Sequence, residues 1–129
     1  TNGIALTAVI GYHDDAILMG ALKVARVHAR SSISHLADVM LLESIHGGRT
    51  LFELLNEKMR DVSHETILTA KAFIEHGCNS IAASDTLYIH RNTFAYRLNK
   101  FIDQTDIDIR DFHLARLIRL WSLLSNIKK

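Results

Sequence analysis

The sequence contains no proline and only one cysteine, Cys78. At average usage, a chain of this length would hold roughly six prolines, and their absence favours uninterrupted helices. A single cysteine cannot form an internal disulfide, which excludes a secreted disulfide-rich scaffold and fits a reducing compartment such as the cytoplasm. No ordered base or basic environment accompanies this thiol, so we expect Cys78 to be a small buried residue rather than a nucleophile.

Long apolar runs and an excess of one charge are also missing. The longest apolar-rich stretch, Leu114–Leu124, contains two arginines and falls short of the about 18 uncharged residues that a membrane span needs. No signal peptide is visible, so we expect a cytoplasmic protein without membrane contact. The 129 residues carry 15 basic and 14 acidic side chains, and this balance does not by itself indicate a nucleic-acid partner. The length predicts roughly one domain, and the first residue, Thr1, leaves open that the chain is a piece of a longer protein.

The motifs of catalytic and metal sites are not visible either. No two of the eight histidines are three, four or five residues apart, so no helix carries a histidine pair with metal-ligand spacing. The glycines form no phosphate-binding loop, and no Gly-x-Ser-x-Gly elbow occurs. We therefore expect no enzymatic activity, no metal and no cofactor.

The first half of the chain predicts a short strand followed by helices. The apolar stretch Ile4–Ile10 favours a strand, and Asp14 and Asp15 suit the start of a helix. A further helix is predicted from Leu36, and Gly47-Gly48 ends it. The residues of this helix that we expect to face inward are Val39, Met40, Leu42 and Ile45.

The third quarter of the chain has the pattern of a helix-turn-helix. Asn79 suits the N-cap of a short helix of about two turns. Tyr88–His90 forms a break without glycine, and a longer helix is predicted from about Arg91 to Thr105. The two helices must approach closely, which the small residues Ala82–Ser84 allow. Ile89 is the expected apolar anchor of the turn.

The longer helix separates an apolar side from a polar side on a helical wheel. The apolar side, which we expect to be buried, carries Phe94, Leu98, Phe101, Ile102 and Thr105. The opposite side carries Asn92, Thr93, Tyr96, Asn99 and Lys100, with Arg97 at its flank. This polar side can be a solvated surface or a surface that binds DNA, and for Tyr96 packing against a neighbouring helix is a further alternative.

Residues at the start of this helix suit base recognition. His90 and Arg91 stand at its N-terminus, from which helix-turn-helix proteins reach base edges. Arginine can bind guanine and asparagine can bind adenine through paired hydrogen bonds, while Tyr96, Arg97 and Lys100 suit phosphate.

The segment His90-Arg91-Asn92-Thr93-Phe94-Ala95-Tyr96-Arg97-Leu98 resembles a family signature, His-Arg-Asn-Thr-x-x-Tyr-Arg-Leu. This is the signature of PucR/CdaR-type bacterial transcriptional regulators. Phe73–Asn79 resembles the family's segment before its first motif helix, and Ile107–Asp111 resembles part of its Gly-Leu-Asp-Leu-Arg-Asp run. The likeness covers roughly Glu65 to Leu124.

The sequence departs from this family in three places. Ser84 stands where the family often has alanine, Asn99-Lys100 where it often has a basic pair, and Asp106 where it usually has glycine. The loss of one basic charge should weaken non-specific phosphate binding. Asp106 leaves the helix end without its left-handed glycine, although aspartate tolerates that conformation moderately.

The resemblance implies a mostly α fold with a helix-turn-helix DNA-binding domain at residues 62–129. Residues 1–61, a short α/β or helical segment, would be the end of a preceding regulatory, nucleotide-cyclase-like region. The implied function is sequence-specific binding of duplex DNA in transcription regulation, with a small-molecule effector bound outside this chain. Because the near-neutral charge suggests weak DNA binding by a monomer, we also expect a homodimer. The residues that match the site are His90, Arg91, Asn92, Thr93, Tyr96, Arg97 and Lys100.

The last predicted helix supports an alternative function. Asp111 suits its N-cap, and its polar residues form a narrow stripe in an otherwise apolar helix: His113, Arg116, Arg119 and Ser122. Such a helix is either packed centrally or also buried against a second copy through Leu117, Leu120, Trp121 or Leu124. The alternative is therefore a protein-interaction or oligomerisation module. Contact of Arg116 and Arg119 with phosphate is a third possibility.

Overall fold

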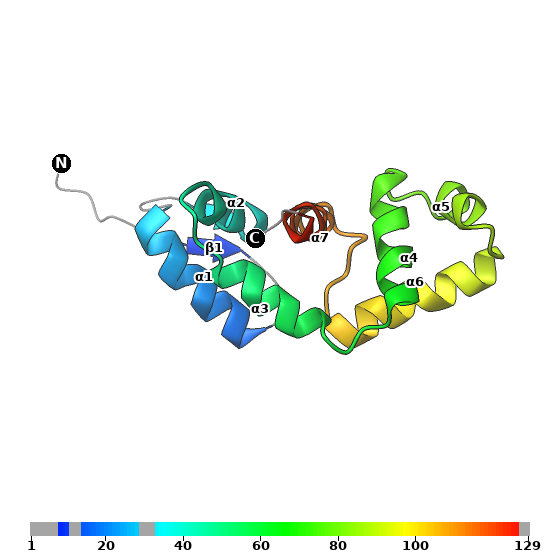
Figure 1. The fold of residues 1–129 in the computed structure, drawn as a ribbon, viewed down its shortest axis with the longest axis horizontal. Coiled ribbons are helices and arrows are strands. Elements are labelled where there is room, and N and C mark those ends of the chain that lie inside the picture. Colours follow the sequence, from blue (N-terminus) through cyan, green and yellow to red (C-terminus); the bar gives the residue numbers. More distant parts are fainter. Residues whose placement is uncertain (1–7, 11–13, 29–32, 127–129) are drawn as a thin grey trace. The chain divides into compact units, whose positions relative to one another are not determined.

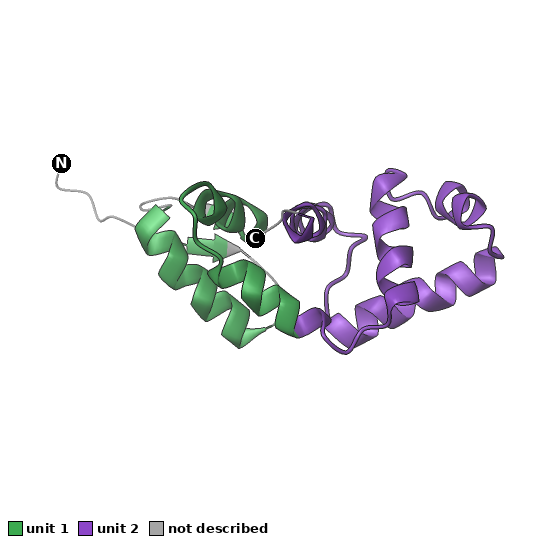
Figure 2. Cartoon of the chain, in the orientation of Figure 1, with its two compact units in different colours: residues 1–57 green, residues 58–129 purple. Residues whose placement is uncertain are grey.

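The computed structural model describes residues 8–10, 14–28 and 33–126, and most of them are helical (Figure 1). The elements in chain order are β1 (Ala8–Ile10), α1 (Asp15–His28), β2 (Ile33–His35), α2 (Leu36–Ile45), α3 (Thr50–Met59), α4 (His64–Glu75), α5 (Ser80–Leu87), α6 (Arg91–Thr105) and α7 (Phe112–Ser125). The chain divides into two compact units, residues 1–57 and 58–129 (Figure 2). The predicted mostly helical fold is confirmed.

The first unit contains a small parallel sheet. β1 pairs with β2 in parallel, with Ala8 opposite Ile33 and Ile10 opposite His35, and α1 and α2 contact these strands. The predicted strand is confirmed for residues 8–10, while residues 4–7 lie outside the described residues. The predicted helix start is also found, because the Asp14 side chain accepts a hydrogen bond from the Ile17 amide.

One prediction for the core of the first unit is wrong. Ile45 was expected to face inward, but it is 68% exposed, while Glu43 is buried. The buried stripe of α2 runs through Leu36, Val39 and Met40 to Glu43, and Ile45 lies about 200° around the helix from Glu43. The carboxylate of Glu43 is satisfied in the interior because it accepts a hydrogen bond of 3.1 Å from the Leu51 amide.

The second unit consists of α4 to α7, and each of its helix starts has a side-chain cap. Ser63 accepts a hydrogen bond from the Thr66 amide at the start of α4. Asn79 caps α5 by accepting from two amides, and Asp111 caps α7 in the same way. The predicted caps Asn79 and Asp111 are confirmed, and each of the three caps stabilises its helix by about 1 kcal/mol.

The expectation that Cys78 is buried is wrong. Cys78 is exposed and has a φ of +61° in the turn between α4 and α5. Its Sγ lies 3.9 Å from the Ile109 carbonyl oxygen, which is a weak contact. Cys78 is exposed because this turn lies at the surface, although a residue as small as cysteine would fit in a core.

The core of the second unit lies along the inner side of α6. Phe94, Leu98, Phe101 and Thr105 are buried there, and the Phe73 ring of α4 lies 6.4 Å from the Phe94 ring. α4 (green) crosses α6 (yellow) in Figure 1, and it also contacts α5 and α7. The predicted apolar side of this helix is therefore its packed side.

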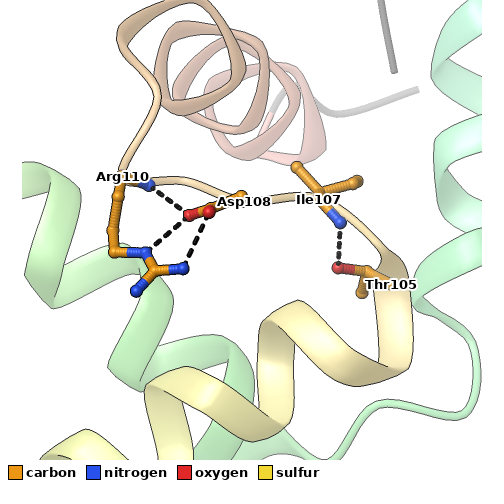
Figure 3. Close-up of polar contacts among 4 residues, drawn as sticks. All are labelled: Thr105, Ile107, Asp108 and Arg110. Atoms are coloured by element: carbon orange, nitrogen blue, oxygen red, sulfur yellow. Dashed lines mark hydrogen bonds and ion pairs between the residues drawn. The ribbon is translucent and has the colours of Figure 1, made fainter. Parts of the chain in front are cut away.

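A short extended turn joins α6 to α7 (Figure 3). Asp106 ends α6 with a φ of +58°, and the Thr105 hydroxyl accepts a hydrogen bond of 3.1 Å from the Ile107 amide. Asp108 binds the Arg110 guanidinium through two hydrogen bonds of 2.8 Å. These bonds from Arg110 hold the pKa of the Asp108 carboxyl below its ordinary value. Ile107 and Ile109, the neighbours of Asp108 in the chain, are fully buried. The turn is therefore held by its buried isoleucines and by the Asp108–Arg110 pair.

The last helix buries two of the residues that were expected at a second copy. Leu117 and Trp121 are buried within the single chain, as is Ser122 of the expected polar stripe. Leu120 and Leu124 are half-buried. The Lys71 ammonium of α4 lies 5.9 Å from the Trp121 ring. Central packing is therefore correct for this side of α7, and Leu117 and Trp121 do not form a free surface.

Candidate nucleic-acid interface

The turn between α5 and α6 reverses the chain without glycine. Tyr88 takes the left-handed conformation, with a φ of +56°, and the Ile89 amide donates to the Ser84 carbonyl at 3.1 Å. His90 is the N-cap of α6, and its Nδ1 accepts a hydrogen bond of 3.0 Å from the Asn92 amide. The Tyr88 side chain is 95% exposed. The Ile89 side chain is half-buried, so it anchors the turn less deeply than expected.

The close approach of the two helices uses the small residues of α5. Ala83 and Ser84 are fully buried, while Ala82 is half-buried. The buried Ser84 hydroxyl donates to the Ile81 carbonyl at 2.9 Å, so it leaves no unsatisfied polar group between the helices. Serine at this position, where the resembled family often has alanine, is therefore accommodated.

The predicted site residues lie together on the outer side and the N-terminal end of α6. Five of them are exposed: His90, Arg91, Asn92, Thr93 and Tyr96. Because Tyr96 is 67% exposed, the alternative in which it packs against a neighbouring helix is wrong. An open hollow at the start of α6 is lined by Asp85, Ile89, His90, Arg91 and Asn92.

Arg97 and Lys100 lie at the flank of this surface. Both are half-buried, and the Arg97 guanidinium forms an ion pair of 3.5 Å with Glu65 in the first turn of α4. The Glu65 side chain is 72% exposed, so solvent weakens the pair. The pair holds the guanidinium beside the outer face of α6.

Sequence reasoning left two exposed residues of α6 without a role. Asn99 belongs to the predicted polar side, and Ala95 is an apolar residue beside it, yet both are exposed on α6. The helical wheel had already placed Asn99 on the polar side of this helix, so its exposure could be predicted. Ala95 carries no polar signal, and only its exposure in the structure draws attention to it.

Comparison with known proteins identifies this segment. Residues 66–121 match the family model of the PucR C-terminal helix-turn-helix domain. This segment is a PucR-type helix-turn-helix domain. It is a DNA-binding domain of the PucR type, and two curated proteins similar to part of this chain are named as a transcriptional activator and a regulator.

Curated relatives are similar to part of this chain. The chain is 34% identical over 59 residues to the proline-responsive transcriptional activator PutR of Bacillus subtilis, which covers 46% of this chain and 14% of PutR. It is 32% identical over 77 residues to the carbohydrate diacid regulator of Escherichia coli, covering 57% of this chain and 20% of that regulator. The uncharacterized protein YxkF of Bacillus subtilis is 41% identical over 49 residues, or 38% of this chain and 16% of YxkF. The chain thus spans between 14% and 20% of the length of these relatives.

Metal-binding clusters and membrane-spanning helices are both absent from the part of the chain that the structure describes. Among the described residues, no group of three or more His, Cys, Asp or Glu side chains is arranged to hold a metal ion. In the same part of the chain, none of the helices is long and apolar enough to cross a bilayer.

Proposed function

We propose that this chain binds duplex DNA in a sequence-specific way, with α6 in the major groove. The observation that carries the proposal is the outer side of α6, where Arg91, Asn92 and Thr93 are exposed beside the capped N-terminus. The first acidic residue of α6 is Asp103, in its last two turns. The N-terminal part of the helix can therefore approach the phosphates of DNA without repulsion from its own carboxylates.

The site residues divide into two roles. His90, Arg91, Asn92 and Thr93 contact bases or orient the side chains that do, because the N-terminal residues of a helix in the major groove reach the base edges. The backbone contacts come from Tyr96, Arg97 and Lys100.

We propose that the whole protein around this domain is a transcriptional regulator. Residues 62–129 are its DNA-binding domain, and residues 1–61 end a preceding regulatory region. The two parallel strands with their helices fit an α/β region of this kind. A small-molecule effector binds outside this chain, and the protein acts in the cytoplasm.

A homodimer is the second part of the proposal. The net charge of the chain is only +1, which gives a single copy little non-specific attraction to DNA. A two-fold dimer doubles the contacts and binds half-sites about 34 Å apart. The low net charge and the two-fold geometry of helix-turn-helix dimers support this part of the proposal.

Fluorescence anisotropy with a labelled random-sequence duplex tests the DNA proposal. The chain is titrated at two salt concentrations, beside a variant in which Arg91, Arg97 and Lys100 are changed to alanine. Because Arg97 and Lys100 are the two cations proposed to bind phosphate, the variant's salt dependence, the slope of log K against log[salt], should be about 2 units shallower. Salt-sensitive binding by the wild-type chain that is lost in the variant is the expected result.

A matched control separates the site from overall charge. Changing Lys23, Arg26 and Arg60 to alanine removes the same three charges outside α6. This control should bind DNA within about twofold of the wild-type chain, because none of the three side chains belongs to the proposed DNA-binding surface. Equal losses in both variants would contradict a DNA site on α6.

The exposed side of α7 favours an oligomerisation module as the second candidate. Phe112 is 71% exposed and Leu123 is 47% exposed, and their spacing of three turns places them on one face of the helix. If the wild-type chain fails to bind DNA in low salt while sedimentation shows a dimer, this candidate replaces the first.

A further inference from the structure

Four exposed residues form a single stripe along α6. Asn92, Ala95, Tyr96 and Asn99 follow the spacing i, i+3, i+4 and i+7, which places them on neighbouring positions of one face. All four are exposed. The base-reading positions of homeodomain recognition helices have the same spacing. The surface on α6 suited to bases therefore extends beyond its first turn.

The buried residues and the two cations of α6 determine which face of the helix can contact the base edges in the major groove. Phe94 and Leu98 face the interior, and Arg97 is held at one side by Glu65. Lys100 is half-buried on the same side as Arg97. The cations are thus placed toward a backbone, and Asn92, Ala95 and Asn99 of the stripe are placed toward the bases.

The length of the stripe sets the number of base pairs within its reach. Asn92 and Asn99 are seven residues apart, which is about 10 Å along a helix and corresponds to roughly three base pairs. One turn further, Asp103 is exposed on the same face. Its carboxylate is repelled by phosphate, so the contact ends near Asn99.

We propose that Asn99 and Ala95 are specificity-determining residues of this DNA-binding surface, an inference that rests on the proposed function. The Asn99 amide, with one donor and one acceptor group, binds N6 and N7 of an adenine in the major groove. The Ala95 methyl group contacts the methyl group of a thymine. The operator half-site therefore contains A·T pairs within about three base pairs of the position that Asn92 contacts.

The test for Asn99 uses the full chain and a randomised duplex pool. Sequences are selected with the wild-type chain, with Asn99→Ala and with the control Gln104→Ala, which removes an exposed amide of α6 outside the stripe. We expect Asn99→Ala to lose discrimination at one A·T pair, from about five- to 150-fold down to near none. The control should select the wild-type sequence. Thermal melting by circular dichroism checks that each variant is folded.

The test for Ala95 changes the DNA rather than only the protein. Each thymine of the selected duplex is replaced in turn by uracil, which removes its methyl group. At one position the replacement should weaken wild-type binding by about fourfold, the value of one buried methyl-sized group. The same replacement should leave the affinity of Ala95→Gly unchanged.

Three outcomes decide the inference. Selection of the wild-type sequence by Asn99→Ala, with affinity lowered equally for all duplexes, would overturn the role of Asn99. Equal uracil effects in the wild type and in Ala95→Gly would overturn the role of Ala95. Absence of salt-sensitive DNA binding by the wild-type chain would overturn the proposed function itself, which distinguishes that failure from the other two.

Discussion

Replacing Asp106 by glycine should stabilise the second unit. Asp106 ends α6 in the left-handed conformation, with a φ of +58°, and its side chain is exposed. Its amide donates to the Ile102 carbonyl at 2.7 Å, and glycine keeps this hydrogen bond. The substitution therefore changes the conformational preference and the charge of the residue while it removes no buried contact.

The magnitude of the gain follows from two contributions that favour glycine and one that opposes it. The left-handed conformation costs an L-residue about 1–2 kcal/mol, and aspartate lies at the low end. A carboxylate near a helix C-terminus costs a further ~0.3–1 kcal/mol, whereas the greater freedom of glycine in the unfolded chain opposes the gain by about 0.5–1 kcal/mol. The expected net gain in the free energy of unfolding is roughly 0.5–1 kcal/mol, or about 2–8 °C in Tm for a unit of this size.

Urea denaturation followed by tryptophan fluorescence measures this gain. Trp121 is the single tryptophan of the chain, and it is buried in α7, so the signal reports on the second unit. Asp106→Asn is the control that removes the charge and keeps a side chain that tolerates a positive φ. It should recover only the contribution of the charge.

A reciprocal variant tests the same conformational cost in the opposite direction. Gly77 has a φ of +65°, and a Cβ added there meets no atom within 4 Å. Gly77→Ala should therefore lose about 1 kcal/mol through the backbone alone. If Gly77→Ala shows this loss while Asp106→Gly is less stable than Asp106→Asn, left-handed strain at Asp106 is refuted.

Two further predictions concern charged pairs of the second unit. Glu65→Gln should release Arg97 from its ion pair and tighten DNA binding about two- to threefold at low salt, with a stability change below about 0.5 kcal/mol; anisotropy titrations that show weaker binding would contradict this. The folded-state pKa of Asp108 is lowered by Arg110, so its stabilising contribution is present above the unfolded pKa, near 4, and is lost as the pH falls through the folded pKa. As the pH is lowered from 5 to 2, the free energy of unfolding measured in urea should therefore fall less for Asp108→Asn than for the wild type. Identical pH profiles for the two proteins would contradict this prediction.

The ends of the helices could be predicted from sequence because they depend on local chemistry. The side-chain oxygens of Ser63, Asn79 and Asp111 bond to amides two or three residues away, so a short stretch of sequence contains both partners. The inner side of α6 was predictable for a similar reason, since an apolar stripe at helical spacing must be buried.

Residues whose surroundings come from distant parts of the chain could not be predicted in this way. Glu43 is buried because the Leu51 amide satisfies it, and a periodic pattern gives no sign of such a partner. The ion pair of Arg97 with Glu65 joins residues in two helices, so the sequence indicated a flank position without its partner. The exposure of Cys78 depends on a turn with a positive φ, a conformation that composition does not reveal.

The burial of α6 along its whole length has a thermodynamic consequence. Its inner side is packed from Phe94 in the first turn to Thr105 in the last, so the helix exists before any DNA is bound. Docking then requires no coil-to-helix transition, and the ordering cost of ~2–5 kcal/mol that segments folding on their targets meet is absent. The heat-capacity change of binding should accordingly reflect only the area buried at the interface, and association should proceed as the collision of two preformed surfaces.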